Sequence, residues 1–193
     1  MESTEGEAAV RIARAVAESE TRGDMCNIQA PPSFSEHGGV FVTISEHPSG
    51  ALRGCIGYPE PVFSIVDSLK MSASAACHDP RFDDLTFEET GKCIFEVTLL
   101  TVPEEIRYDD PDDLIGSIEI GQDGLIMEFK GSRGLLLPQV PVEWGWDAEE
   151  FLGHLSMKTG FAPDVWRHPD VRIKRFGGEI FSETCPYGDI VRR

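Results

Sequence analysis

Strict alternation of apolar residues predicts the first strand. In segment 39–45, Val40, Val42 and Ile44 fall on one side of the chain and the residues between them fall on the other. Successive side chains of a strand point to opposite faces, so this pattern is typical of a strand with one buried face. The turn sequence HPSG separates it from a second strand at 51–58, and the short connection predicts a hairpin.

Apolar residues recur at helical spacing in three segments, and each segment has a start or a stop signal. Thr4 and Glu7 have the spacing of a capping box at the start of the first predicted helix. Pro61 suits the first position of the second helix. Asp147 and Glu150 repeat the capping-box spacing before the third. The residues that end these three helices are Gly23, Pro80 and Gly160.

Further short apolar segments predict more strands. The turn signal Gln122-Asp123-Gly124 predicts a hairpin between two of them, and Gly177-Gly178 predicts a second hairpin that closes the fold. Because helices do not alternate strictly with strands, the pattern indicates an α+β fold with a mostly antiparallel sheet. The predicted strands are 93–100, two or three between 117 and 137 (117–121, 125–130, 135–137), and 172–176 with 179–182.

Charge and hydropathy narrow the class of protein. The chain carries 17 Lys and Arg against 34 Asp and Glu, a net charge of −17. Such a surface repels phosphate backbones and anionic lipid headgroups. No apolar run approaches the ~18 residues that a membrane span needs, and MESTEGEAAV lacks the features of a secretory signal. We therefore expect a protein that binds neither nucleic acid nor membrane.

The five cysteines favour a reducing compartment. Their number is odd, their spacings are wide and no Cys-x-x-Cys occurs, unlike a disulfide framework or a zinc site. The histidines have no paired ligand spacing. We expect a cytoplasmic protein that holds neither a metal nor another cofactor.

The segment LRGCIG, residues 52–57, is unusual for a strand. Arg53, Cys55 and Gly57 share one face, and neighbours on a face lie ~7 Å apart along the backbone. Arginine stays protonated, so its charge favours the thiolate of Cys55. Gly54 and Gly57 leave room for another backbone or a ligand. The segment predicts a reactive or ligand-contacting thiol, unless Cys55 is a buried small hydrophobe and Arg53 pairs with an acid.

The segment CHDPRF, residues 77–82, supplies further candidates. His78 lies at the predicted end of a helix and would be a proton acceptor for Cys55 if the two meet. Asp79 and Arg81 flank the rigid Pro80, which fixes their backbone directions. The alternative is a helix stop with a local Asp–Arg ion pair.

Two polar residues stand in apolar surroundings. Glu96 interrupts the strand CIFEVTLL, so either its face is exposed to water or the carboxylate pairs with a cation such as Arg53. Gln139 lies between two prolines and has an amide that both donates and accepts hydrogen bonds. It is a candidate to orient a substrate, or an ordinary loop residue.

Six motifs occur in order over residues 39–152: GVFVTI, LRGCIGY, DPRF, DGL, GLLLPQVP and WDAEEFL. Together they resemble the AMMECR family, with LRGCIG as the family's hallmark, and later pieces extend the resemblance nearly to residue 183. LSMKTGF departs from the alanine- or cysteine-containing version expected in the second lobe. The chain is similar to the stand-alone prokaryotic members, so we expect an archaeal or bacterial source.

The resemblance implies a two-lobed α+β fold in which a mostly antiparallel sheet is flanked by helices and the second lobe is smaller. Residues 1–193 would form one AMMECR-type domain of two closely fused lobes. The resemblance also implies a shared face around the hallmark. Its residues would be Arg53, Gly54, Cys55 and Gly57, with Asp79, Arg81 and Gln139.

Members of the family are encoded with, or fused to, Memo-like and radical-SAM proteins, which suggests a pathway that modifies a small molecule or a protein. Two hypotheses stay open. In the first, the protein is an enzyme or an enzyme accessory with Cys55 as nucleophile, Arg53 as its activator, His78 or Glu96 moving protons, and Gln139 orienting the substrate. In the second, the same face is a non-catalytic module that docks a peptide or such a partner protein.

Overall fold

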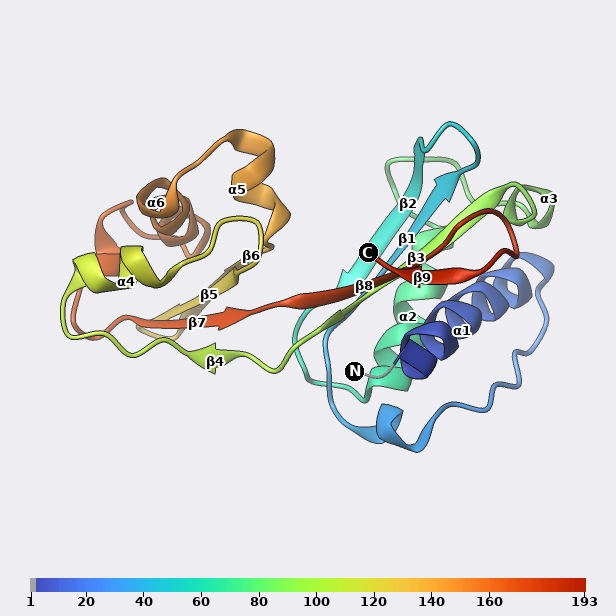
Figure 1. The fold of residues 1–193 in the computed structure, drawn as a ribbon, viewed down its shortest axis with the longest axis horizontal. Coiled ribbons are helices and arrows are strands. Elements are labelled where there is room, and N and C mark those ends of the chain that lie inside the picture. The colour runs from blue at the N-terminus through green and yellow to red at the C-terminus, as the bar shows by residue number, and fades with distance from the viewer. Residues whose placement is uncertain (1–2) are drawn as a thin grey trace. The chain divides into compact units, whose positions relative to one another are not determined.

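The computed structural model describes residues 3–193 and divides the chain into two compact units (Figure 1). The first unit comprises the chain up to Thr101 together with Gly178–Arg193, and the second, smaller unit is Val102–Gly177. Each unit contains one antiparallel sheet and its own helices. The predicted α+β fold with mostly antiparallel sheets flanked by helices is confirmed. Of the described helices, none has the length and hydropathy needed to cross a bilayer.

The sheet of the first unit has the strand order β2-β1-β3-β8-β9, so β2 is one of its two edges. Helices α1 (Ser3–Arg22) and α2 (Ile65–Cys77) pack side by side against its inner face (Figure 1). The hairpin predicted at the start of the sheet is confirmed. The strands are β1 (Val40–Glu46), β2 (Leu52–Tyr58), β3 (Cys93–Leu100), β8 (Gly178–Glu183) and β9 (Ile190–Arg192), and α3 is Phe87–Thr90.

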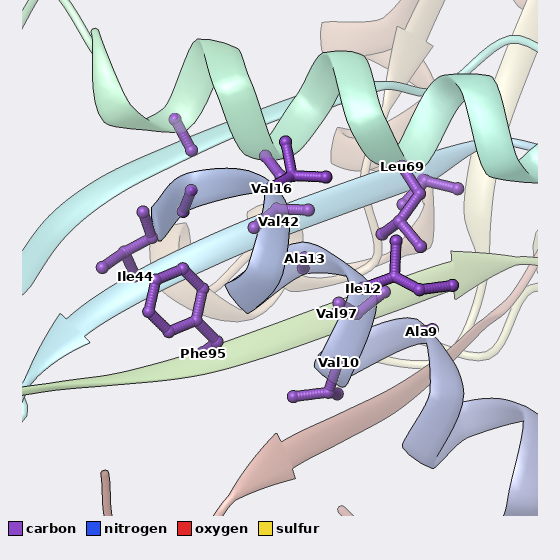
Figure 2. Close-up of a cluster of buried hydrophobic side chains, with 14 of the residues drawn as sticks. Ala9, Val10, Ile12, Ala13, Val16, Val42, Ile44, Leu69, Phe95 and Val97 are labelled. Carbon is purple, nitrogen blue, oxygen red and sulfur yellow. The ribbon is translucent and has the colours of Figure 1, made fainter. Parts of the chain in front are cut away.

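The core of the first unit lies between these helices and the inner face of the sheet. Alternate residues of β1 and β3 are fully buried, as the sequence pattern predicts, and the residues between them are only half-buried. Removing apolar side chains from water is the main favourable contribution to folding, about 1.5–3 kcal/mol for each large side chain. Figure 2 shows Ile12, Val16, Val42, Leu69 and Phe95 meeting in this cluster.

The helix ends follow local signals, with two corrections. Gly23 ends α1 with φ of +72°, which suits glycine, as predicted. Thr4 lies inside α1 rather than at its N-cap. The second helix does not begin at Pro61: its N-cap is Ser64, whose hydroxyl accepts a hydrogen bond from the N–H of Asp67.

The second unit has a four-stranded sheet in the order β4-β7-β5-β6 and a core that includes Leu125, Met127, Phe151 and Trp166. The predicted capping box at Asp147 is confirmed at the start of α6. The strands are β4 (Glu104–Glu105), β5 (Gly124–Phe129), β6 (Ser132–Leu136) and β7 (Arg172–Phe176), and the helices are α4 (Pro111–Ser117), α5 (Gln139–Trp144) and α6 (Ala148–Lys158).

Two predicted hairpins are wrong. Segment 117–121 is not a strand, because Ser117 ends α4 and a turn follows. The residues 122–124 therefore connect a helix to β5 and do not join two strands. Strands β7 and β8 are consecutive but belong to different sheets: β7 pairs with β4 and β5, and β8 pairs with β3 and β9. The glycines at 177 and 178 therefore join the two units instead of closing a hairpin.

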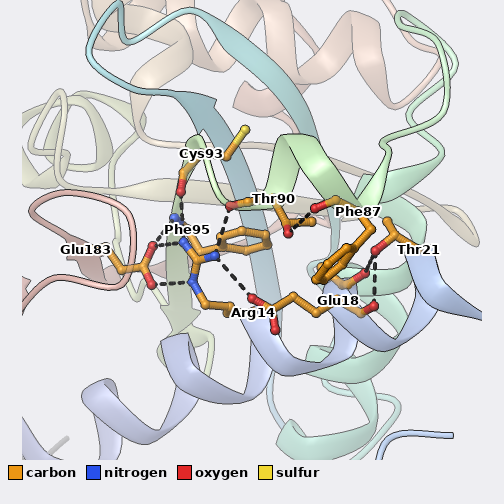
Figure 3. Close-up of polar contacts among 9 residues, drawn as sticks. Arg14, Glu18, Thr21, Phe87, Thr90, Cys93, Phe95 and Glu183 are labelled. Atoms are coloured by element: carbon orange, nitrogen blue, oxygen red, sulfur yellow. Dashed lines mark hydrogen bonds and ion pairs between the residues drawn. The ribbon is translucent and has the colours of Figure 1, made fainter. Parts of the chain in front are cut away.

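A buried ion pair joins α1 to β8 in the first unit (Figure 3). Arg14 donates through Nε to Oε1 of Glu183 at 2.6 Å and through Nη2 to Oε2 at 2.5 Å. Its remaining N–H groups reach the carbonyls of Thr90 and Cys93, and the N–H of Phe95 donates to Glu183. Every charge in the network thus has hydrogen-bond partners, as a buried pair requires.

Replacing Glu183 by alanine should lower the free energy of unfolding of the first unit by about 3–5 kcal/mol, because the Arg14 charge would stay buried without a carboxylate. Urea denaturation followed by circular dichroism measures this loss. The matched control is Glu18→Gln, which removes a second carboxylate 3.5 Å from the same guanidinium; it should cost about 0.5 kcal/mol or less. Equal losses in the two variants would contradict the importance of the buried pair.

Candidate functional site

The edge strand β2 is held at Cys55 by the segment that follows α2. The N–H of Cys55 donates to Oδ2 of Asp79 at 2.8 Å, and Nη2 of Arg81 donates to the Cys55 carbonyl at 3.1 Å. An edge strand exposes such backbone groups unless something covers them. Asp79 and Arg81 therefore take the place of a neighbouring strand. They also form the ion pair that the sequence analysis gave as an alternative. We call these contacts the Cys55 clamp.

The Cys55 clamp is strongly polarised. Arg81 donates through Nε to Oδ1 of Asp79 at 2.9 Å and through Nη2 to Oδ2 at 2.6 Å, in the two-pronged geometry that makes arginine–carboxylate pairs strong. The Asp79 side chain is almost wholly buried, while that of Arg81 is about half exposed. The Arg81 guanidinium and the N–H groups of Cys55 and Arg81 hold the pKa of Asp79 far below its usual range. Asp79 is therefore a fixed anion at neutral pH.

Arg53 attaches the same strand to the loop beyond Arg81. Its guanidinium binds both oxygens of Glu89, at 3.0 and 3.2 Å, and the carbonyls of Asp83 and Asp84, at 2.8 and 3.1 Å. The Arg53 side chain is 11% exposed. Arg53 thus pairs with an acidic residue, which was the alternative to its activating Cys55. Activation of Cys55 by Arg53 stays a prediction.

Close packing occupies the space above both glycines of the hallmark. A Cβ on Gly54 would lie 2.2 Å from the carbonyl oxygen of Ala76, at the end of α2, and a Cβ on Gly57 would lie 2.2 Å from the ring of Phe41. Neither approach is possible for a larger residue without a shift. Gly54 therefore allows the backbone of another element to come close, which is one of the two possibilities that the sequence predicted. Gly57 allows an aromatic ring to come close. Contact of either glycine with a ligand stays a prediction.

The thiol of Cys55 lies on the outer face, which is the face of the sheet opposite α1 and α2. There Cys55 is paired in register with Thr43, Thr43 with Glu96, and Glu96 with Ser182. The hydroxyl of Thr43 donates to the sulfur of Cys55 at 3.2 Å. Because strands lie ~4.8 Å apart, the thiol and the Glu96 carboxyl belong to one row with backbones about 10 Å apart. We call these four residues the outer-face row.

Glu96 occupies an environment that disfavours its charge. Burial raises the pKa of the Glu96 carboxyl, while Arg193 and a hydrogen bond from Ser182 partly oppose that shift. The nearest cation is Arg193, with Nε 3.8 Å from Oε2, and not Arg53 as considered in the sequence. Glu96 is therefore a better proton acceptor than an ordinary surface carboxylate.

Two further candidates remain, His78 in the first unit and Gln139 in the second. The ring nitrogens of His78 contact Asp84 at 3.0 Å and Glu20 at 3.3 Å, and these carboxylates raise the pKa of His78. A His78–Cys55 pair thus has no contact to support it. Gln139 is the first residue of α5 in the second unit, and its part in a site stays a prediction.

A hollow of about 720 Å³ lies beside the Cys55 clamp. Its lining includes Arg53, Arg81, Phe82 and Glu89. Among the described residues that line this hollow, Cys55 is absent. Arg53 thus lines this polar hollow, the thiol of Cys55 lies in the outer-face row, and a cleft centred on both residues stays a prediction. Within residues 3–193 no group of three or more His, Cys, Asp or Glu could hold a metal ion.

Sequence reasoning missed Thr43, Glu89 and Ser182. Alternation places Thr43 on the polar side of β1, so its face could be found, but its pairing with Cys55 follows only from the hairpin register. Glu89 has a local signal, the capping box with Thr86 at the start of α3. Nothing near Ser182 in the sequence indicates its place beside Glu96.

A two-unit α+β protein with antiparallel sheets and a clamped edge strand is the class that these observations define. The chain belongs to the AMMECR1 family, whose model matches residues 10–181. The chain is 47% identical over 191 residues to Protein MJ0810 of Methanocaldococcus jannaschii, covering 98% of this chain and 95% of that protein. It is 45% identical over 167 residues to Protein PH0010 of Pyrococcus horikoshii, covering 84% of this chain and 81% of that protein.

The fold agrees with an experimental structure. The crystal structure of uncharacterized protein PH0010 from Pyrococcus horikoshii matches with a TM-score of 0.81 at 42% identity, over 100% of this chain and 98% of that chain. The predicted membership of the AMMECR family is thus confirmed, and these relatives are archaeal proteins.

Acid should weaken the attachment of β2 through Glu89. The Arg53 guanidinium and the Thr86 N–H lower the pKa of Glu89 from 4.5 to about 2. A depressed pKa in the folded state stabilises the protein above the unfolded pKa, and that stability is lost as pH falls toward the folded value. The difference in unfolding free energy between the wild type and Glu89→Gln should therefore be constant above pH 5 and shrink between about pH 4.5 and 2.

Urea denaturation at a series of pH values measures that difference. Glu88→Gln is the control, because it removes an exposed carboxyl from the same short helix. If the Glu88→Gln difference shrank in the same way, the effect would not be specific to the contact of Glu89 with Arg53. A Glu89→Gln difference that does not change with pH would contradict the assignment.

Proposed function

We propose that the protein is a binding module whose contact surface is the outer face of the first unit, centred on Cys55, Thr43 and Glu96. Hydrogen bonds within the chain supply the main support. Arg53, Asp79 and Arg81 bind backbone groups and carboxylates of their own unit, so they shape β2 rather than surround the thiol. In the outer-face row, Thr43, Cys55 and Glu96 are half-buried and remain to meet a ligand, whereas Ser182 is buried.

The outer face has the mixed composition of a recognition surface. The Cys55 thiol and the Thr43 hydroxyl lie next to half-buried apolar side chains such as Phe41 and Ile94. A surface of this kind excludes water over its apolar part and orients a partner through its polar groups. The partner that the family resemblance suggests is a Memo-like protein, with a radical-SAM protein as the second choice.

An arginine placed on the outer face should abolish this binding. Thr43→Arg should weaken the affinity for a purified Memo-like protein at least tenfold, about 1.4 kcal/mol, because a long charged side chain would stand in the middle of the contact. Cys55→Ala should bind within about twofold of the wild type, because no chemistry is required of the thiol. Isothermal titration calorimetry gives the dissociation constants.

The matched control is Thr21→Arg, the same substitution on α1 and therefore behind the opposite face of the sheet. It should bind as the wild type does. Equal affinities for Thr43→Arg and Thr21→Arg would rule out the outer face as the contact surface, and circular dichroism establishes that both variants are folded.

A second candidate is an enzyme in which the sulfur of Cys55 adds to a carbonyl carbon, so that the C–S bond forms as the C=O π bond opens, while Glu96 accepts the thiol proton. One observation favours it: the pKa of Glu96 is raised by burial and its carboxyl lies in the same row as the thiol. The Thr43 hydroxyl between them already donates to the sulfur, which stabilises negative charge there.

If this candidate is right, Cys55 should react with iodoacetamide faster than Cys185, although Cys185 is the more exposed of the two. Peptide mapping by mass spectrometry compares both sites in one digest. Glu96→Gln should slow the reaction at Cys55 about a hundredfold or more, the lower end of the range for loss of a general base, and leave Cys185 unchanged. Equal rates at the two cysteines, unaffected by Glu96→Gln, would exclude the enzyme.

A further inference from the structure

A second concave surface lies on the second unit, between α6 and the segment 163–167. Its volume is about 450 Å³. Gly153 and Trp166, both buried, belong to its lining, and His154 and Met157 line it from α6. Nothing in the proposed function uses this surface. We call it the tryptophan hollow.

Aromatic rings are stacked in series beside the tryptophan hollow. The His154 ring lies 3.6 Å from the ring of Trp146, nearly parallel at 5°, and Trp146 stacks on Trp144 at 6.1 Å and 17°. The last ring of the series, Trp144, is 70% exposed. Met157, which lines the hollow, is 47% exposed. Large exposed apolar side chains grouped in this way mark contact sites more often than ordinary surface.

The charge around the tryptophan hollow is strongly negative. Its lining includes the carboxylates of Asp147, Glu149, Glu150 and Asp164 and a single cation, Arg167. Arg167 is already paired, at 2.6 Å with Glu149 and at 3.7 Å with Asp112. Asp147 and Glu150 bind each other's backbone N–H groups, and in the described part of the chain neither of them nor Asp164 forms a salt bridge. Among the described residues, Asp147, Glu150 and Asp164 therefore have no cation to balance their charge, whereas Glu149 is paired with Arg167.

We propose that the tryptophan hollow binds an arginine or lysine side chain from a basic segment of a partner protein. A guanidinium or ammonium group in the hollow would meet carboxylates that lack a cation, and the stem of the side chain would pack against Met157. The exposed face of Trp144 attracts a second cation or an apolar neighbour in the same segment. Buried tryptophan and arginine contacts contribute most to interfaces of this kind.

Intrinsic fluorescence tests the proposal directly, because all three tryptophans of the chain belong to the ring series or to the lining of the hollow. The probe is a ten-residue Gly/Ser peptide that carries three arginines. The control peptide carries three glutamates in their place. At 0.15 M salt, where distant charges are screened beyond about 8 Å, the arginine peptide should change the emission in a saturable way and the glutamate peptide should not.

Variants separate this site from a general attraction of cations to an acidic protein. Trp144→Ala and Asp164→Asn should each raise the dissociation constant about fivefold or more, the change that 1 kcal/mol produces. Glu104→Gln, the matched control, also removes one exposed carboxyl of the second unit, but it lies in β4, outside the lining, and should leave the constant unchanged. Calorimetry repeats the measurement without relying on Trp144.

Three results would overturn the proposal. They are no binding of the arginine peptide by either method, equal binding of the glutamate peptide, and equal weakening by Asp164→Asn and Glu104→Gln. The last result would mean that the peptide responds only to the overall net charge of −17. The outer-face experiments use other residues and another unit, so failure here leaves them unaffected.

Discussion

The edge of a sheet has backbone groups that must be bound by something, and in the first unit this constraint falls on β2. Asp79 and Arg81 meet it at Cys55, and Arg53 extends the attachment to the loop that leads into α3. Gly54 allows the end of α2 to approach the same strand. LRGCIG and DPRF are therefore two halves of one attachment, which holds β2 beside β1 and so keeps the thiol on the outer face.

The fold could be predicted wherever the deciding residues are close in sequence. Alternation in 39–45 identified β1 and its buried side, and Asp147 with Glu150 identified the start of α6. Prediction failed where distant pairing decides. Strands β7 and β8 are separated by one residue, yet Lys174 pairs with Ile126 and Phe181 pairs with Val97. The local sequence contains no signal that assigns two consecutive strands to different sheets.

The candidate site shows the same limit at the level of side chains. The period of a strand correctly relates neighbouring positions of β2, but it does not determine where a long side chain ends. Arg53 could reach many of the 34 acidic residues, and it binds Glu89, 36 positions away. The sequence named Asp79 and Arg81 as an ion pair. Their second role, binding the backbone of Cys55, depends on how the segment after α2 returns to the sheet edge.

The buried pair of Arg14 and Glu183 joins residues 169 positions apart. A ribosome delivers the chain in order, so α1 and three strands of the first unit emerge long before β8 does, whereas every strand of the second unit lies within one uninterrupted stretch, Val102–Gly177. The sheet of the first unit can therefore be completed only after the whole second unit has been synthesised. Until β8 has been synthesised, that sheet has an open edge at β3, and Arg14 lacks the carboxylate that binds it in the folded unit.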